Sequence, residues 1–275
     1  MTDVLVNSKW VAENLDDPNV RLIHIDRDRL EGYTAAHIPG AIGWNWKDML
    51  WDPFERQFPS EEQFCARLGL AGISNDTTVV LYGVPVQFGT YAWWVFKLCG
   101  HVDVRLLDGG LVKWELEGRP VTQDVPGVSP VTYLSPMRRE GLRVGRDDVL
   151  QRINDSECTI LDHRSPEEYS GLRVSPLGMF DHGAERSGRI PGAVHIPYDS
   201  LLNDDTTFKS PEVLKEIFAA HVPDWSHPVI SYCRLSHRAT LANFAMTQLL
   251  GYQNARVYDG SWTEWGSIVG FPIER

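Results

Sequence analysis

The chain has 275 residues, of which 43% are hydrophobic and 23% are charged, and its formal net charge at pH 7 is −11. This composition excludes a disordered chain, and the length allows one large domain or two ordinary ones. Because an acidic surface repels phosphate groups, we expect neither nucleic acid nor an anionic membrane as a partner.

The N-terminal segment, residues 1–17, mixes charged and apolar side chains and does not predict a signal peptide. No apolar run approaches the roughly 20 residues of a transmembrane helix. The four cysteines lie at positions 65, 99, 158 and 233, without a C-x-x-C pair or a zinc-binding spacing. We therefore expect reduced thiols in a cytoplasmic protein, and no metal.

Segments of the first half of the chain return in the second half in the same order. The matching pairs are HIPGAI (37–42) with RIPGAV (189–194), VVLYG (79–83) with VISYC (229–233), and LDGGLVKW (107–114) with YDGSWTEW (258–265). The offsets between the members of each pair lie between 150 and 152 residues. We interpret the chain as two copies of one domain.

The copies have predictable bounds. The stretch 125–142, between the copies, contains three prolines and little periodicity, so we expect a linker there. This leaves a first domain at 1–124 and a second at 143–275. The second copy also carries about 16 additional residues between Tyr169 and Ile190, and their glycines, prolines and charges predict a loop.

Short apolar runs alternate with helical patterns in each copy. In the second copy the expected strands are 158–161, 194–196, 229–232 and 255–258, and the expected helices are near 146–154, 211–220 and 239–250. This alternation predicts an α/β fold with a mostly parallel sheet flanked by helices. Sites in such sheets form beyond the carboxyl ends of strands, and Cys233 stands at one such end.

The loop after this cysteine has a composition that suits an anion. Its residues are Cys233, Arg234, Leu235, Ser236, His237 and Arg238. A helix N-terminus and nearby cations both stabilise a thiolate, whereas a cysteine at a strand end can also be a plain buried thiol. The first copy has Gly83 at the equivalent position and no cation in the next four residues. We therefore interpret Cys233 as a nucleophile in an anion-binding loop.

The chain as a whole resembles the tandem-domain rhodaneses, a family of thiosulfate and 3-mercaptopyruvate sulfurtransferases. The resemblance rests on the segments LDHRSPEEYSG, GRIPGAVHIPY, VISYCRLSHR and YDGSWTEWGSIVGFPIE, together with HIPGAI and LLDGGLVKWELEGRPV in the first half. It implies two tandem rhodanese-like domains, an inactive first domain and a catalytic second domain.

The resemblance also implies a mechanism. Cys233 would take the outer sulfur of thiosulfate as a persulfide and pass it to cyanide or to a thiol, which could belong to a thioredoxin-like protein. The loop from Arg234 to Arg238 would bind the small anionic donor, with both arginines at its oxyanion end. No organic cofactor is required.

Three residues outside the loop are supporting candidates. Asp162 and Arg164 follow an expected strand; they form either a surface turn or, as the resemblance suggests, a brace for the loop. Arg186, near the end of the insert, is either a solvated charge or part of a rim that steers anions.

Several features leave alternatives open. Thiosulfate-using relatives have a basic residue and a glycine where this loop has Leu235 and Ser236, and mammalian-type members have an arginine where this chain has Glu168. A 3-mercaptopyruvate sulfurtransferase is therefore the first alternative. A cysteine phosphatase needs an arginine six positions after the cysteine, but Arg238 is at the fifth. A non-catalytic binding or redox-sensing protein is the remaining alternative.

Overall fold

The structure is a computed structural model that describes residues 4–134 and 141–275. The chain divides into two compact units: unit 1 is Met1–Arg139 with Asp204–Thr207, and unit 2 is Glu140–Asn203 with Phe208–Arg275. The linker over 125–142 stays a prediction, and its residues 135–140 lie outside the described residues.

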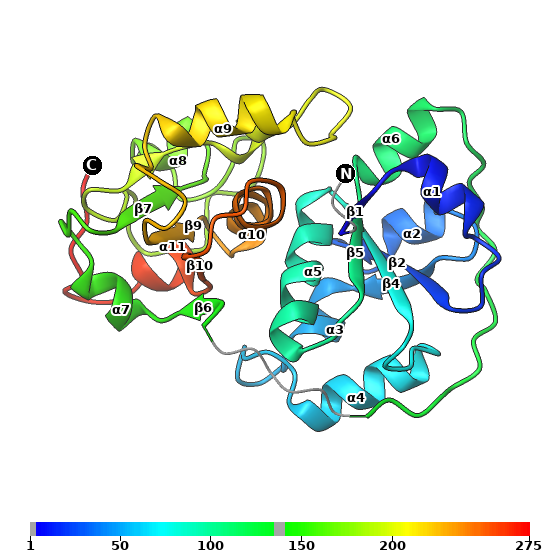
Figure 1. Cartoon of the computed structure of the whole chain (residues 1–275). Helices are drawn as coiled ribbons and strands as arrows, with labels where there is room; N and C mark the ends of the chain where they lie inside the picture. The colour runs from blue at the N-terminus through cyan, green and yellow to red at the C-terminus, as the bar shows by residue number, and fades with distance from the viewer. Residues whose placement is uncertain (1–3, 135–140) are drawn as a thin grey trace. The chain divides into compact units, whose positions relative to one another are not determined.

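Unit 1 contains a parallel five-stranded sheet in the order β1-β5-β4-β2-β3 (Figure 1). Its strands are β1 (Leu5–Val6), β2 (Val20–Asp26), β3 (Ile42–Asn45), β4 (Thr78–Val84) and β5 (Val104–Leu107). Its helices are α1 (Ser8–Glu13), α2 (Glu31–Ala35), α3 (Trp46–Leu50), α4 (Glu61–Leu70), α5 (Gln87–Cys99) and α6 (Gly110–Leu116).

Unit 2 contains a second parallel five-stranded sheet, in the order β6-β10-β9-β7-β8. Its strands are β6 (Arg143–Val144), β7 (Thr159–Asp162), β8 (Val194–His195), β9 (Val229–Tyr232) and β10 (Ala255–Tyr258). Its helical elements are α7 (Arg146–Gln151), α8 (Pro166–Tyr169), η1 (Tyr198–Leu201), α9 (Pro211–Ala219), α10 (His237–Phe244), η2 (Ala245–Leu249) and α11 (Ser261–Trp265). The two strand orders are the same permutation, so the predicted duplication and the α/β fold are confirmed.

The central strands are rich in apolar residues and largely buried, because helices cover both faces of each sheet (Figure 1). All four residues of β9 are buried, and so are five of the seven residues of β4. The core of unit 2 includes Trp262 and Trp265, both 0% exposed. The parallel strands bring their carboxyl ends to one edge of the sheet, where the loop after β9 lies.

The predicted strand 229–232 is confirmed, but the helix predicted from 239 begins two residues earlier, at His237. Ser236 adopts a left-handed conformation, with φ of 73°, and this turn lets the helix start at once. The predicted end of the helix is π-helical over Ala245–Leu249. The early start shortens the loop between β9 and α10 to residues 233–236.

The insert of unit 2, residues 170–189, forms neither helix nor strand, as predicted. Internal hydrogen bonds hold it together. The Asp181 carboxylate accepts from the amides of Val174 and Ser175, at 2.9 and 3.1 Å. The Arg173 guanidinium donates to the carbonyls of Ser175 and Met179, at 3.1 and 2.8 Å.

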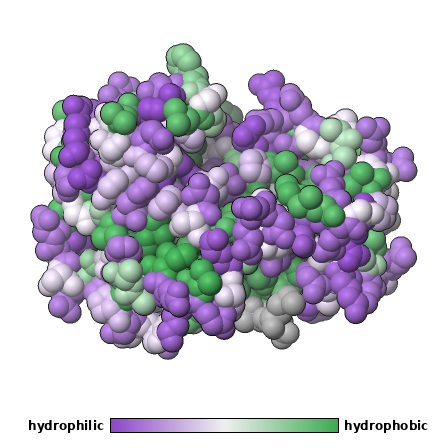
Figure 2. All heavy atoms as spheres, turned by 90° about the horizontal axis from the view of Figure 1, so that it is seen from above, coloured by the Kyte–Doolittle hydropathy of each residue, from purple (hydrophilic) through white to green (hydrophobic). Residues whose placement is uncertain are grey.

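Hydrophilic residues cover most of the molecular face seen in Figure 2, with smaller apolar patches between them. Within residues 4–134 and 141–275, no helix is both long and apolar enough to cross a membrane.

Candidate functional site

Cys233 is the first residue after β9 and is only 1% exposed. Its backbone is held from two sides by the start of α11. The Cys233 amide donates to the Ser261 hydroxyl at 3.2 Å, and the Trp262 amide donates to the Cys233 carbonyl at 2.9 Å. The Thr263 amide likewise donates to the carbonyl of Arg234 at 3.2 Å. These bonds fix the backbone on which the thiol stands.

The far end of the loop is anchored through Ser236. Its hydroxyl lies 2.5 Å from the Asp259 carbonyl oxygen and 3.0 Å from a carboxylate oxygen of the same residue. Asp259 is fully buried and pairs with Arg143 at 3.3 Å. Asp259 was not a candidate from the sequence, and the first copy has Asp108 at the same place. The missed signal was Ser236, a hydroxyl donor that the first copy lacks.

Arg238 lies in the first turn of α10 and forms a buried, two-bond ion pair with Glu168 of α8. Its Nη1 and Nη2 donate to the two carboxylate oxygens at 2.6 and 2.9 Å. The Arg238 side chain is 9% exposed and the Glu168 side chain 0%. Burial alone lowers the pKa of the Arg238 guanidinium, but the hydrogen bonds and charge of Glu168 outweigh it and raise that pKa overall.

This pair changes what can be expected of Arg238. The sequence predicted that Arg238 binds the oxyanion end of the donor, but its guanidinium is already held by a carboxylate. Glu168 stands where the resemblance leads us to expect an arginine, and in the structure its carboxylate is the partner of Arg238. Its second role is local: the same carboxylate accepts from the Ser165 amide at 3.1 Å and caps α8.

Arg234 differs from Arg238 in that no carboxylate among the described residues lies within ion-pair distance of it. Its Nη2 lies 3.4 Å from Nδ1 of His182, in the insert. Its Nε is buried without a hydrogen-bond partner in the described part of the chain. Burial lowers the pKa of this guanidinium. Of the two loop arginines, Arg234 is therefore the one that has no carboxylate partner among the described residues.

The two other predicted loop residues have less distinctive surroundings. Leu235 is partly exposed at the turn of the loop, and His237 is the first residue of α10 and 7% exposed. Amide groups in the first turn of a helix have no acceptor within the helix, so those of α10 face the loop. They add partial positive charge next to the Cys233 thiol.

Asp162 and Arg164 form a fully buried pair at the carboxyl end of β7. The Arg164 Nη2 donates to Asp162 at 2.6 Å and to the Gly188 carbonyl at 2.8 Å. Burial raises the pKa of Asp162, but Arg164 outweighs it and the pKa is lowered overall. The Tyr232 hydroxyl donates to Asp162 at 2.5 Å. Because Tyr232 directly precedes Cys233, the pair holds the end of β9, and a surface turn is excluded.

Arg186 is neither a solvated charge nor part of an anion-steering rim. Its guanidinium donates to four backbone carbonyls, of Trp265, Gly266, Ile268 and Phe271, at distances between 2.7 and 3.3 Å. These acceptors close the turn after α11 and fix the C-terminal segment. The charge of Arg186 is therefore used within the protein.

The family model described as Rhodanese-like domain matches the chain twice, at residues 7–117 and 146–268. The chain belongs to the rhodanese-like family.

Curated relatives match this rhodanese over its whole length. One is the sulfur carrier protein TtuD of Thermus thermophilus, 44% identical over 99% of this chain and 97% of its own. Another, from Mycobacterium bovis, is provisionally named thiosulfate sulfurtransferase 1 and is 44% identical over 99% of this chain and 98% of its own.

Solved structures share the fold. An anaerobic ergothioneine biosynthesis enzyme from Chlorobium limicola has a TM-score of 0.85 and is 24% identical, over 99% of this chain and 70% of its own. A persulfide form of the enzyme EanB, solved with ergothioneine, has a TM-score of 0.87 at 24% identity, over 99% of this chain and 70% of its own.

The first copy has no room for a side chain at the position equivalent to Cys233. At Gly83, which is equivalent to Cys233, a Cβ atom would lie 2.1 Å from the Gly89 amide nitrogen and 2.8 Å from the Pro85 carbonyl oxygen. Both are backbone atoms, which cannot turn aside as a side chain can. The loop after β4 is thus closed against the start of α5.

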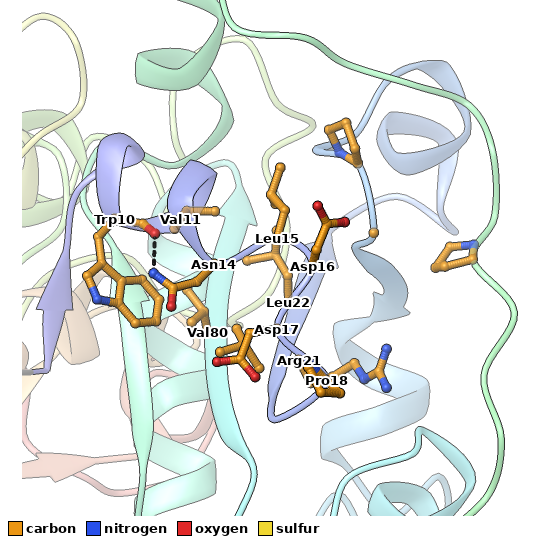
Figure 3. Close-up of a pocket in the computed structure, with 14 residues that line it drawn as sticks. Trp10, Val11, Asn14, Leu15, Asp16, Asp17, Pro18, Arg21, Leu22 and Val80 are labelled. Carbon is orange, nitrogen blue, oxygen red and sulfur yellow. Dashed lines mark hydrogen bonds between the residues drawn. The ribbon is translucent and has the colours of Figure 1, made fainter.

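A pocket of about 190 Å³ lies elsewhere in this rhodanese, in unit 1 (Figure 3). Its lining includes Trp10, Asn14 and Asp17, together with Val20 at the first residue of β2. It therefore opens at the amino ends of the strands, whereas Cys233 stands at the carboxyl end of a strand in unit 2. This pocket is not part of the candidate active site. Within the described residues, no group of three or more His, Cys, Asp or Glu side chains could hold a metal ion.

Proposed function

We propose that this protein is a sulfurtransferase that carries sulfane sulfur on Cys233, with thiosulfate as the donor and a thiophile, cyanide or a thiol, as the acceptor. The observation that carries the proposal is the loop itself. A cysteine at the carboxyl end of β9 is followed by Arg234, which pairs with no carboxylate in the described part of the chain, and by the first-turn amides of α10. The first copy has neither the thiol nor the space for it.

The reaction proceeds in two balanced steps. The Cys233 thiolate attacks the outer sulfur of thiosulfate, the S–S bond breaks, and sulfite leaves with the electron pair, so that Cys233 becomes a persulfide anion. Cyanide or a thiolate then attacks the outer sulfur of the persulfide. Thiocyanate or a new persulfide leaves, and the Cys233 thiolate is regenerated.

The loop residues have distinct roles in these steps. The Arg234 guanidinium binds the sulfonate-like end of thiosulfate and stabilises the departing sulfite. The first-turn amides of α10 stabilise the persulfide anion. Ser236, through Asp259, and Arg238, through Glu168, keep the loop in the shape that presents these amides. The loop is further supported by contacts of Asp162, Arg164 and Arg186 with the segments next to it.

One observation favours 3-mercaptopyruvate as the alternative donor. Because Glu168 neutralises Arg238, the loop offers one uncompensated guanidinium, which suits a single carboxylate as well as it suits a dianion. Thiosulfate remains our choice, because the mycobacterial relatives are provisionally named for it and because the loop amides add to the field of Arg234. Comparison of kcat/KM for the two donors tests this choice, and a higher value for 3-mercaptopyruvate would reverse it.

The acceptor in the cell is proposed to be a thiol, including that of a thioredoxin-like protein. The Thermus relative is named as a sulfur carrier protein, which supports transfer to another thiol rather than to cyanide alone. The four cysteines are free thiols. They fit the cytoplasmic setting that we propose, without nucleic-acid or membrane partners.

Substitution of the nucleophile tests the proposed function. The Cys233→Ser protein is expected to fold normally and to lose all sulfur transfer, because the hydroxyl cannot carry a sulfane sulfur. Mass spectrometry of the wild-type protein after thiosulfate treatment is expected to find one added sulfur, on Cys233. Sulfur on Cys65, Cys99 or Cys158 instead, or full activity of the serine variant, would refute the assignment. A folded wild-type protein that takes up no sulfur from either donor would favour a binding or redox-sensing role.

A further inference from the structure

The insert of unit 2 lies directly against the guanidinium of Arg234. A Cβ atom built on Gly183 would lie 2.5 Å from Nη2, 2.7 Å from Nε and 3.0 Å from Cζ of Arg234. The neighbouring residue, His182, places its Nδ1 3.4 Å from Nη2. A side chain at position 183 would therefore displace the guanidinium, whereas Gly183 lets it lie close to the backbone of the insert.

We propose that Gly183 and His182 are positioning residues that hold the Arg234 guanidinium where it meets the anionic end of the sulfur donor. This inference rests on the proposed function and adds to it, because it assigns the choice of an anionic donor to the insert. The first copy lacks both the insert and the arginine, so the two features occur together.

The surroundings of Arg234 show why it needs such a support. An arginine side chain has several rotatable bonds, and ordering it costs conformational entropy unless contacts fix it. The other arginines of this region are fixed by strong acceptors: Arg186 by four carbonyls and Arg238 by a carboxylate. Among residues 4–134 and 141–275, Arg234 finds no hydrogen-bond partner for its buried Nε, and its Nη2 makes a long contact with His182. Packing against Gly183 is what remains to hold it.

The charges around Arg234 leave its field available to a ligand. Asp181 is the nearest acidic residue of the insert, but its carboxylate is engaged by the amides of Val174 and Ser175. Glu168 is engaged by Arg238. A donor anion that reaches Cys233 thus meets a guanidinium whose position the insert sets and whose charge the described residues do not cancel.

A pair of glycine substitutions separates positioning from general damage to the insert. Gly183 and Gly178 both have positive φ angles, 113° and 80°, so alanine strains the backbone at either position. A Cβ on Gly183 strikes Arg234, whereas one on Gly178 has no atom within 4 Å. Gly183→Ala is the test variant and Gly178→Ala its matched control.

The first readout uses alkylation of Cys233 by two small reagents and does not require sulfur transfer. Iodoacetate is an anion and iodoacetamide is neutral, so the ratio of their rates at Cys233 reports the nearby positive charge. We expect Gly183→Ala and Arg234→Ala to lower this ratio about threefold or more, and Gly178→Ala to leave it unchanged. An equal ratio in the two glycine variants would overturn the inference.

The second readout is the kinetics of sulfur transfer. Loss of a charge-assisted contact predicts a fall in kcat/KM for thiosulfate of roughly tenfold in Gly183→Ala, mainly through KM. A thiosulfonate anion, used as a second donor, carries one charge where thiosulfate carries two. We therefore expect the fall in kcat/KM in Gly183→Ala to be smaller for the thiosulfonate than for thiosulfate. His182→Ala is expected to weaken donor binding, and His182→Asn, which keeps an acceptor near the position of Nδ1, to restore it. Equal losses for both donors, or a fall confined to kcat, would contradict positioning.

The two readouts distinguish the inference from the proposed function. If the wild-type protein takes no sulfur from thiosulfate but the alkylation ratio still falls in Gly183→Ala alone, the proposed function fails and the positioning role stands. If sulfur transfer is found but both glycine variants behave alike, the positioning role fails and the proposed function stands.

Discussion

The buried pair between Glu168 and Arg238 gives the sharpest test of the energetics of the loop. Two parallel hydrogen bonds, of 2.6 and 2.9 Å, join groups that are 0% and 9% exposed. Removing one partner of such a pair leaves an uncompensated buried charge, which costs about 3–5 kcal/mol, whereas replacing both partners with neutral groups is close to neutral. We therefore expect Arg238→Met or Glu168→Gln alone to cost about 3–5 kcal/mol of unfolding free energy.

The double variant decides whether the residues act as a pair. Independent effects would add to about 6–10 kcal/mol, but a true pair predicts a double variant no less stable than either single one. The coupling energy should therefore be at least about 3 kcal/mol. Urea unfolding followed by amide exchange of peptides from β9 and α10 measures the stability of unit 2 itself. Additive losses in the double variant would refute the pair.

Substitutions at the same two positions separate two roles that Arg238 could have in catalysis. We expect Arg238→Ala to lower kcat/KM for thiosulfate by at least about tenfold, or about 1.4 kcal/mol, because the unpaired Glu168 carboxylate then repels a dianion. If repulsion by the Glu168 carboxylate is the cause, adding Glu168→Gln to Arg238→Ala recovers most of the lost kcat/KM. A double variant as slow as Arg238→Ala would mean that Arg238 contacts the donor directly, as the sequence predicted.

Two further predictions follow from buried groups. Burial lowers the pKa of His24 and of His163 from 6.5 to about 4. As the pH falls below 6.5, the unfolded chain therefore binds protons that the folded chain does not yet bind. The free energy of unfolding is at its full value above pH 6.5 and falls by roughly 3 kcal/mol for each histidine toward pH 4. Urea midpoints between pH 7 and 4 measure this, and a profile unchanged in His163→Gln would contradict it. Gly83→Cys, in a Cys233→Ser background, is expected to destabilise unit 1 and to hold no cyanolysable sulfur, and sulfur on the introduced thiol would disprove it.

The fold could be predicted well from the sequence, because the patterns that indicate it are either local apolar runs or segments repeated in both halves of the chain. Apolar runs defined β9 to the residue, and the repeat carried the assignment to the other unit. Cys233 at a strand end followed from the same pattern. The partners of the loop residues could not be predicted in this way. Glu168 and Arg238 are 70 positions apart, and Ser236 and Asp259 are 23 apart. Which residues meet over such separations depends on tertiary packing rather than on periodicity.

Helix boundaries were less predictable for a similar reason. The pattern placed the start of the helix after the loop at 239, because His237 and Arg238 are polar. In the structure both residues are buried, one at the start of α10 and the other paired with Glu168. The sequence therefore predicted an anion-binding loop where Arg238 forms a buried ion pair. Gly183 was also missed, because a glycine in a loop usually indicates a turn rather than a contact with a functional side chain.

Comparison of the two units within one chain separates the scaffold from the additions of unit 2. The Tyr82 and Tyr232 hydroxyls accept from equivalent amides, at 3.1 and 3.2 Å, so this bond belongs to the scaffold. The bond from Tyr232 to Asp162 and the ion pair with Arg164 are additions, since the position equivalent to Arg164 is an aspartate in unit 1.

The ion pair between Glu168 and Arg238 is also specific to unit 2, because the position equivalent to Glu168 is Gly32 in unit 1. In unit 1, Gly83 packs against Gly89, whereas in unit 2 the loop after Cys233 is followed by the buried ion pair of Arg238 with Glu168. Buried ion pairs are a poor source of stability compared with apolar packing. Within the described residues, the ion pairs of Arg164 and Arg238 have no counterpart at the equivalent positions of unit 1, which fits the anion-binding role that we propose for the loop after Cys233 better than the needs of the fold.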